Sequence, residues 1–261
     1  MAFTHSNRSF FIIADDLGLN KAVNDGIFFA FEQRLIDGAS LMPNGKAFED
    51  ALIRIKNTSN IGIHFVLVEE QPLVLKSFPA NHKIFFIKYI LGLIRLGDIR
   101  KELEAQTNKL TRAGIKPAFI NSHQHLHLLP GIMDIIIELA RKFDIPCIRI
   151  VNEPIFLNEG RLFRQVQLLF LNFLSGLAKK KIKKFGLTCN DFFVGFINAG
   201  NLEIKDLKSA EKLGKRYPEK IVELGCHPGF ESRDLIEKYS RWQYNWEKEI
   251  DVLKIRNDED K

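Results

Sequence analysis

The chain has 261 residues, of which 46% are hydrophobic and 27% are charged, and its formal net charge is +6. This composition excludes an intrinsically disordered protein, and the length is enough for one large domain with a sizeable core. No stretch of about eighteen uncharged apolar residues is present, which excludes a membrane-spanning helix. The first apolar run is too short for a secretory signal, and the three cysteines are widely spaced, so we expect a cytoplasmic protein with reduced thiols.

Short apolar runs that end in polar residues recur along the chain and predict buried parallel strands. They cover residues 10–14, 61–63, 118–120, 145–151 and 221–225. Helical patterns lie between them, over residues 21–34, 102–113, 130–143 and 207–217. Strand and helix alternate with no linker or repeat, which predicts one α/β domain over residues 1–261, a distorted or incomplete (β/α) barrel. Residues 153–200 are expected to form an elaborated basic and apolar segment of this domain.

The positive charge is concentrated in two segments that are also rich in leucine, isoleucine and phenylalanine. Residues 161–186 hold seven basic residues and no acidic one, and residues 82–101 hold five basic residues and one acidic one. We expect both segments to contact the inner face of a membrane peripherally. A core-packing helix with solvated lysines and a homodimer contact are the alternatives. The basic residues form no polar stripe, so a nucleic-acid partner is not expected.

Carboxylates and histidines follow several of the predicted strands, whose carboxyl ends meet at one face of a barrel. Asp16, His64 and His123 would offer one carboxylate and two imidazoles to one divalent metal ion. Asp15 is the candidate general base, and His227 is the candidate acid for a leaving amine. Because a metal activates water and polarises a carbonyl, the set indicates hydrolysis of an amide or an ester.

Each of these features also has an ordinary structural explanation. An Asp-Asp pair often caps a helix, and a histidine in an apolar strand is usually a hydrogen-bonded core residue. The cluster of His123, His125 and His127 is more specific, because alternate residues of an extended segment point the same way. Cys226 beside His227 could indicate a thiol nucleophile, but a buried and inert cysteine is the interpretation we favour.

Five stretches in chain order carry these residues. They are IIADDLGLNKAVNDGI (12–27), SLMPNGKAFEDA (40–51), IGIHFVLVEEQPL (61–73), KPAFINSHQHLHLLPGI (116–132) and LGCHPGF (224–230). Together they resemble the YdjC-like carbohydrate deacetylases. The resemblance implies a barrel of the glycoside hydrolase/deacetylase type and metal-dependent removal of an acetyl group from an N-acetylated sugar. It implies magnesium or zinc on the metal-ligand set above, Asp15 and His227 as catalytic residues, and His125 and Asn44 as substrate-binding residues.

One position departs from the family pattern. Asn121 stands where the family usually has an Asp before Ser-His, so the ligand histidine, which we expect to be His123, could keep a hydrogen bond but would lose a negatively charged partner. The stretches IRIVNEP (148–154) and NDFFVGF (190–196) favour the branch associated with hopanoid biosynthesis, in which the sugar is joined to a lipid. Within the first stretch, Arg149 and Glu153 are expected to pair with each other.

Two other functions fit parts of the pattern. A metal-dependent phosphoesterase would use a similar Asp/His set, but it normally shows more carboxylates and a bridging ligand for a second metal. A non-catalytic sugar-lipid binding protein would need only the fold, and the intact Asp15, Asp16, His64, His123 and His227 argue against it. The leading hypothesis is a metal-dependent deacetylase that acts on an acetylated oligosaccharide or lipid-linked sugar.

Overall fold

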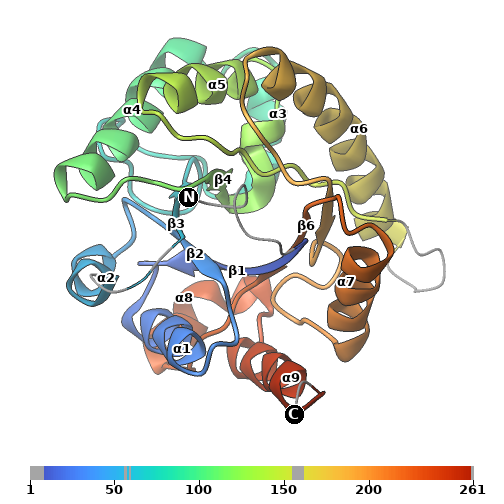
Figure 1. Ribbon diagram of the computed structural model, residues 1–261. Coiled ribbons are helices and arrows are strands. Elements are labelled where there is room, and N and C mark those ends of the chain that lie inside the picture. The colour runs from blue at the N-terminus through green and yellow to red at the C-terminus, as the bar shows by residue number, and fades with distance from the viewer. Residues whose placement is uncertain (1–8, 56–57, 59, 155–161, 260–261) are drawn as a thin grey trace.

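The computed structural model describes residues 9–55, 58, 60–154 and 162–259. Its centre is a curled parallel sheet of six strands in the order β4-β3-β2-β1-β6-β5, and helices surround the strands (Figure 1). The strands are β1 (Phe10–Leu17), β2 (Gly38–Leu41), β3 (Ile61–Phe65), β4 (Ile120–Ser122), β5 (Phe192–Val194) and β6 (Val222–Cys226). This arrangement confirms the predicted single-domain α/β fold of the barrel-like type.

The end of β1 departs from regular strand geometry where the two aspartates lie. The residues from Phe11 to Ala14 before them are buried, because this strand is central and is covered on both faces. The pairing register of β1 with β2 shifts between Ala14 and Leu17, and Asp16 has a φ of 66°. Such a bulge redirects side chains at a sheet end, so the two adjacent carboxylates reach different partners.

Residues 145–151, predicted as a strand, do not form one. Ile148 makes an isolated parallel bridge to Ile120 of β4, and Cys147 makes another to Thr188. The segment alternates between two neighbours, so no ladder along one neighbour becomes long enough to be a regular strand. The prediction is therefore wrong in detail, but the segment still runs between β4 and the residues just before β5.

Nine α-helices and two 3-10 helices are found in the residues that the structure describes. The α-helices are α1 (Lys21–Glu32), α2 (Phe48–Ile55), α3 (His82–Ile90), α4 (Leu96–Arg112), α5 (Ile132–Lys142), α6 (Leu162–Lys184), α7 (Ile204–Arg216), α8 (Arg233–Tyr239) and α9 (Trp246–Glu259). The 3-10 helices are η1 (His123–Leu128) and η2 (Ser240–Trp242). The four predicted helical patterns correspond to α1, α4, α5 and α7, and Gly114 follows the end of α4 with a φ of 83°.

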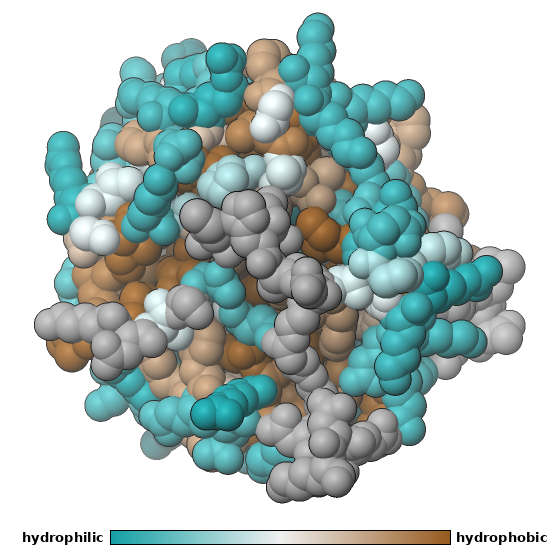
Figure 2. Space-filling view, in the orientation of Figure 1, coloured by the Kyte–Doolittle hydropathy of each residue, from teal (hydrophilic) through white to brown (hydrophobic). Residues whose placement is uncertain are grey.

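Hydrophilic side chains project around the periphery of the face shown in Figure 2, as expected for helices that cover a central sheet. Within the described ranges, no helix has the length and apolar character needed to cross a membrane. The elaborated segment predicted at 153–200 contains α6 and β5, while its residues 155–161 lie outside the described residues.

Candidate active site

Asp16, His64 and His123 come together at the carboxyl ends of β1, β3 and β4, and all three are buried. One ligand atom from each lies within 4.8 Å of the others. Asp16 Oδ1 is 3.3 Å from His64 Nε2 and 3.3 Å from His123 Nδ1. Neither carboxylate oxygen of Asp16, nor Nε2 of His64, has a hydrogen-bond partner among the described residues. Buried polar atoms normally have partners, so this donor set fits one divalent metal ion.

A second contact on each histidine determines which ring nitrogen faces Asp16. His64 Nδ1 donates to Asn121 Oδ1 at 2.7 Å, and this contact turns His64 Nε2 toward Asp16. His123 Nε2 lies 2.9 Å from Glu69 Oε2, and this contact orients the ring so that Nδ1 faces Asp16. Although burial opposes a charged ring, the Asp16 and Glu69 carboxylates raise the pKa of His123 to about 10. The site therefore favours positive charge, and a metal ion would displace this proton.

Asp15 lies beside this metal-ligand set, and donors contact both of its carboxylate oxygens. Ser40 Oγ donates to Asp15 Oδ1 at 2.7 Å, and Asn121 Nδ2 donates to the same oxygen at 2.9 Å. Arg149 donates to both oxygens, through Nη2 at 2.9 Å and through Nη1. Although burial would raise it, the Arg149 guanidinium holds the pKa of Asp15 well below its usual range. Asp15 is therefore a charged carboxylate in a fixed orientation.

Arg149 does not pair with Glu153, contrary to the prediction from their spacing. Arg149 is buried and binds two carboxylates from neighbouring strands, those of Asp15 and Glu223, with Nε donating to Glu223 Oε1 at 2.6 Å. Glu153 instead accepts the backbone N–H of Phe196 at 2.7 Å. Proximity in sequence suggested a local pair, whereas the curled sheet brings β1 and β6 to the guanidinium.

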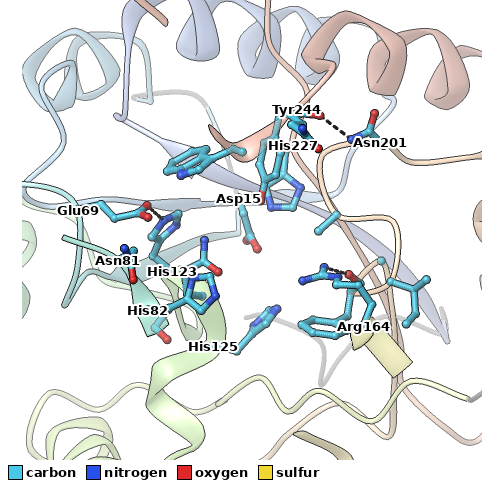
Figure 3. A pocket seen from close by; sticks show the side chains of 18 of the residues that line it. Asp15, Glu69, Asn81, His82, His123, His125, Arg164, Asn201, His227 and Tyr244 are labelled. Carbon is cyan, nitrogen blue, oxygen red and sulfur yellow. Dashed lines mark hydrogen bonds and ion pairs between the residues drawn. The ribbon is translucent and has the colours of Figure 1, made fainter. Parts of the chain in front are cut away.

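A cavity of about 550 Å³ opens over Asp15, His64 and His123. Figure 3 shows Asp15 between His123 on one side and His227 on the other. Aromatic side chains form much of the wall, namely Phe193, Phe196, Trp242 and Tyr244. Polar and apolar groups thus meet in one pocket that is large enough for a small molecule such as a sugar.

His227 enters the cavity just after β6. Its backbone N–H donates to Glu249, and its Nδ1 lies 3.9 Å from Glu249 Oε2. Nδ1 has no hydrogen-bond partner within the described part of the chain. The ring packs against Tyr244, with ring centroids 4.9 Å apart. The neighbouring Cys226 thiol is buried, and burial raises its pKa well above the usual range, so it is poorly suited to act as a nucleophile.

The segment that holds three histidines is not extended, so its alternate residues do not point the same way, contrary to the prediction. Residues 123–128 form η1, in which Gln124 and His125 have φ values of 56° and 54°. This tight turn, rather than strand alternation, sends each histidine to a different place. His123 reaches Asp16, and His125 lines the cavity.

His125 and His127 differ in their surroundings. His125 packs edge-on against Phe193 with ring centroids 5.7 Å apart, and burial keeps its pKa well below the usual range. It therefore offers the cavity a neutral ring. His127 lies outside the cavity lining, where its Nε2 donates to the Arg149 carbonyl at 2.9 Å and its Nδ1 lies 2.7 Å from Ser122 Oγ. This places His127 as a support for the neighbouring backbone.

Two asparagines differ from what the sequence suggested. Asn121 contacts the ligand histidine His64, whereas we expected its effect on His123. Asn44, predicted to bind substrate, is not among the residues that line the cavity. Its Nδ2 donates to the carbonyl of Gln71 at 2.9 Å, so the structure does not bring Asn44 to the other site residues.

Several residues of the site were not identified from the sequence. Glu69, which contacts His123, lies shortly after β3 in the stretch 61–73. Its position as a charged residue after a predicted strand could have identified it. Trp242 belongs to η2, and its ring packs against the His123 ring with ring centroids 4.9 Å apart. Nothing in the local sequence around Trp242 points to the site, because α8 and η2 bring it there from far along the chain.

The chain resembles known proteins over most of its length. A family model described as YdjC-like protein matches residues 9–256. The chain belongs to the YdjC-like protein family. The match spans all six strands and every site residue described above.

Three YdjC-like relatives are proteins named carbohydrate deacetylase. The one from Clostridium beijerinckii is 26% identical over 246 residues, which are 92% of this chain and 89% of that protein. The one from Oceanobacillus iheyensis is 28% identical over 252 residues, which are 93% of this chain and 94% of that protein. The one from Xenopus laevis is 28% identical over 256 residues, which are 85% of this chain and 81% of that protein.

A solved structure from Enterococcus faecalis, described as a cellobiose-phosphate cleavage protein, has the same fold. Its TM-score is 0.70 at 19% sequence identity, and the match covers 95% of this chain and 91% of that chain. At this identity the likeness shows the YdjC-like fold alone.

Proposed function

We propose that this YdjC-like protein is a metal-dependent deacetylase that removes the N-acetyl group from an acetylated amino sugar. The observation that carries the proposal is the buried set of Asp16, His64 and His123, whose ligand atoms converge beside a cavity lined by Asp15 and His227. The relatives named carbohydrate deacetylase, which align over most of the chain, support the substrate class.

The chemistry divides among a few residues. A divalent metal ion, magnesium or zinc, held by the Asp16 set would polarise the acetyl carbonyl and make water more acidic. Asp15 accepts the proton of the attacking water, because Arg149 keeps its carboxylate charged and aimed into the cavity. Arg149 also makes Asp15 a weak base. Asp15 therefore binds the proton only briefly and gives it up again before the next turnover.

His227 is the second proton-transfer group. It lines the same cavity as Asp15, and Glu249 faces its Nδ1 and holds its backbone. We assign His227 the role of protonating the amine nitrogen as the C–N bond breaks. His125 and the aromatic wall would contact the sugar, because apolar ring faces and aromatic side chains pack well together.

Acetate release tests the proposal. The substrates are N-acetylglucosamine oligosaccharides and an N-acetylglucosamine joined to a lipid. Each is assayed with the protein as purified, with the protein after chelator treatment, and with the treated protein reloaded with zinc or magnesium. We expect turnover that the chelator removes and one of the metals restores. Turnover that is indifferent to the chelator, or phosphate-ester hydrolysis without any acetate release, would overturn it.

We further infer that the sugar is joined to a lipid, as in the hopanoid-associated branch, and that the protein works in the cytoplasm. The stretches 148–154 and 190–196 support the branch. Cys147, Cys189 and Cys226 are all buried free thiols, which supports a reducing compartment.

A further inference from the structure

Large hydrophobic side chains that are exposed to solvent gather on two segments of the chain. Of nineteen such residues in the described part, six lie between residues 84 and 96 and seven lie between residues 162 and 177. The six are Ile84, Ile87, Ile90, Leu91, Leu93 and Leu96, and the seven are Leu162, Phe163, Val166, Leu169, Phe170, Phe173 and Leu177. Exposed apolar groups that cluster in this way mark an interaction site.

The two segments form one surface. Phe86 of α3 packs edge-on against Phe170 of α6, with ring centroids 5.7 Å apart. We call the exposed apolar residues of 84–96 and 162–177 the α3–α6 surface. It is built from α3, the turn that follows it, the first residue of α4 and the outer side of α6, and the Phe86–Phe170 contact joins its two segments.

α6 is apolar on two opposite faces, which explains why one face stays uncovered. Its inner face packs on the barrel through Leu168, Leu174, Ala178 and Ile182, all buried. Its outer face repeats every three or four residues through Leu162, Val166, Leu169, Phe173 and Leu177. A solvent-facing helix side is normally polar, yet Phe173 is 64% exposed. The inner face alone holds the helix, so the outer face is available to another surface.

The charge around this surface is positive. Residues 82–97 and 161–186 contain no acidic residue. The exposed cations of these two ranges are Lys83, Lys88, Arg95, Lys180, Lys181, Lys183 and Lys184, and Lys181 pairs with Asp134 of α5. Lys180 and Lys184 follow Phe173 and Leu177 by seven residues and so continue the outer face of α6. A symmetric dimer through this surface would bring the same cations together, whereas an anionic bilayer would neutralise them.

We propose that the α3–α6 surface docks on an anionic lipid bilayer, with its apolar side chains among the headgroups and its lysines against the phosphates. The surface adjoins the cavity, since Asn81, His82 and Lys83 at the start of α3 and Arg164 of α6 line it. Docking would hold the cavity at the level of the headgroups. The inference rests on the proposed function only in naming a lipid-linked sugar as what the cavity would meet there.

Vesicle co-sedimentation of the full chain tests the docking. Vesicles of phosphatidylcholine alone are compared with vesicles that also contain phosphatidylglycerol. We expect at least about 10-fold stronger partitioning to the anionic vesicles, and a loss of about that size in the Leu169→Ser/Phe173→Ser variant and in the Lys180→Glu/Lys184→Glu variant. The matched control is Ile53→Ser/Ile236→Ser, which replaces exposed apolar residues elsewhere and should bind as the natural protein does.

Absence of binding to anionic vesicles, or binding unchanged in both test variants, overturns the proposal. So does a dimer in sedimentation velocity that the Leu169→Ser/Phe173→Ser variant dissociates, because it would assign the surface to a second copy. Acetate release from a soluble oligosaccharide should be equal in all variants. A protein that docks but releases no acetate contradicts the deacetylase, and one that releases acetate but does not dock contradicts this inference.

Discussion

Asn121 serves the metal-ligand set and the candidate base with one side chain. Its carbonyl oxygen accepts a hydrogen bond from His64 Nδ1, and its amide donates to Asp15 Oδ1. The amide orientation is unambiguous, since Asp15 can only accept. An Asp at this position would keep the contact with His64, would add negative charge to it, and would no longer donate to Asp15.

Replacing Asn121 by alanine and by aspartate should therefore affect metal affinity differently. Asn121→Ala removes the acceptor that orients His64, so we expect metal binding to weaken by roughly 10–100-fold. Asn121→Asp keeps an acceptor and makes His64 more basic, so its affinity should equal or exceed that of the natural protein. Competition with a zinc-binding dye measures both. An alanine variant that binds metal as tightly as the natural protein would contradict this role.

Asp15→Asn tests the general base without removing a metal ligand. We expect turnover to fall by at least about 10²-fold, because the amide cannot accept the proton. The metal content should stay at one ion per chain, which elemental analysis checks. The assignment fails if acetate release persists, and a variant without metal would instead place Asp15 among the ligands.

At the scale of elements, Arg149 connects the irregular segment 145–151 to two strands. Through Asp15 it reaches β1, and through Glu223 it reaches β6. All three side chains are buried, so each charge depends on the others. This network gives the segment a fixed position that its two isolated bridges would not provide alone.

Arg149→Met should destabilise the fold strongly, because it leaves two buried carboxylates without their cation. We expect the free energy of unfolding to fall by about 3–5 kcal/mol. The control is Arg141→Met on α5, where the side chain is exposed and the change should stay within about 0.5 kcal/mol. Urea unfolding compares them, and equal losses in the two variants would refute the network.

Glu153 ties the same segment to the chain after β5. It accepts the N–H of Phe196, a cavity residue, and burial raises the pKa of Glu153 from 4.5 to about 7. The folded state thus binds this proton more tightly than the unfolded state. The stabilisation from protonation is complete below about pH 4.5 and is lost as the pH rises through about 7.

Glu153→Gln cannot titrate, so its stability relative to the natural protein should rise with pH. Between about pH 5 and pH 8 the difference in free energy of unfolding should shift in favour of the variant by up to about 3 kcal/mol. Urea unfolding at both pH values measures it. A difference that is the same at the two values would show that Glu153 is charged throughout.

For the whole molecule, local patterns in the sequence were enough for the fold class. Apolar runs such as 10–14 and 221–225 predict strands because burial on both faces of a parallel sheet demands them. The partners of Arg149 were not predictable, because they depend on which strands the curled sheet brings together. Likewise, the left-handed turn at His125 and the approach of Trp242 have no periodic signal in the sequence.

Anomalous diffraction from crystals grown with zinc would test directly whether Asp16, His64 and His123 bind the catalytic metal ion. We expect one strong peak, bound by a carboxylate oxygen of Asp16, by His64 Nε2 and by His123 Nδ1, on the side that faces the cavity with Asp15 and His227. A peak at another place in a catalytically active protein, or an active protein whose crystals show no metal between these three residues, would contradict it.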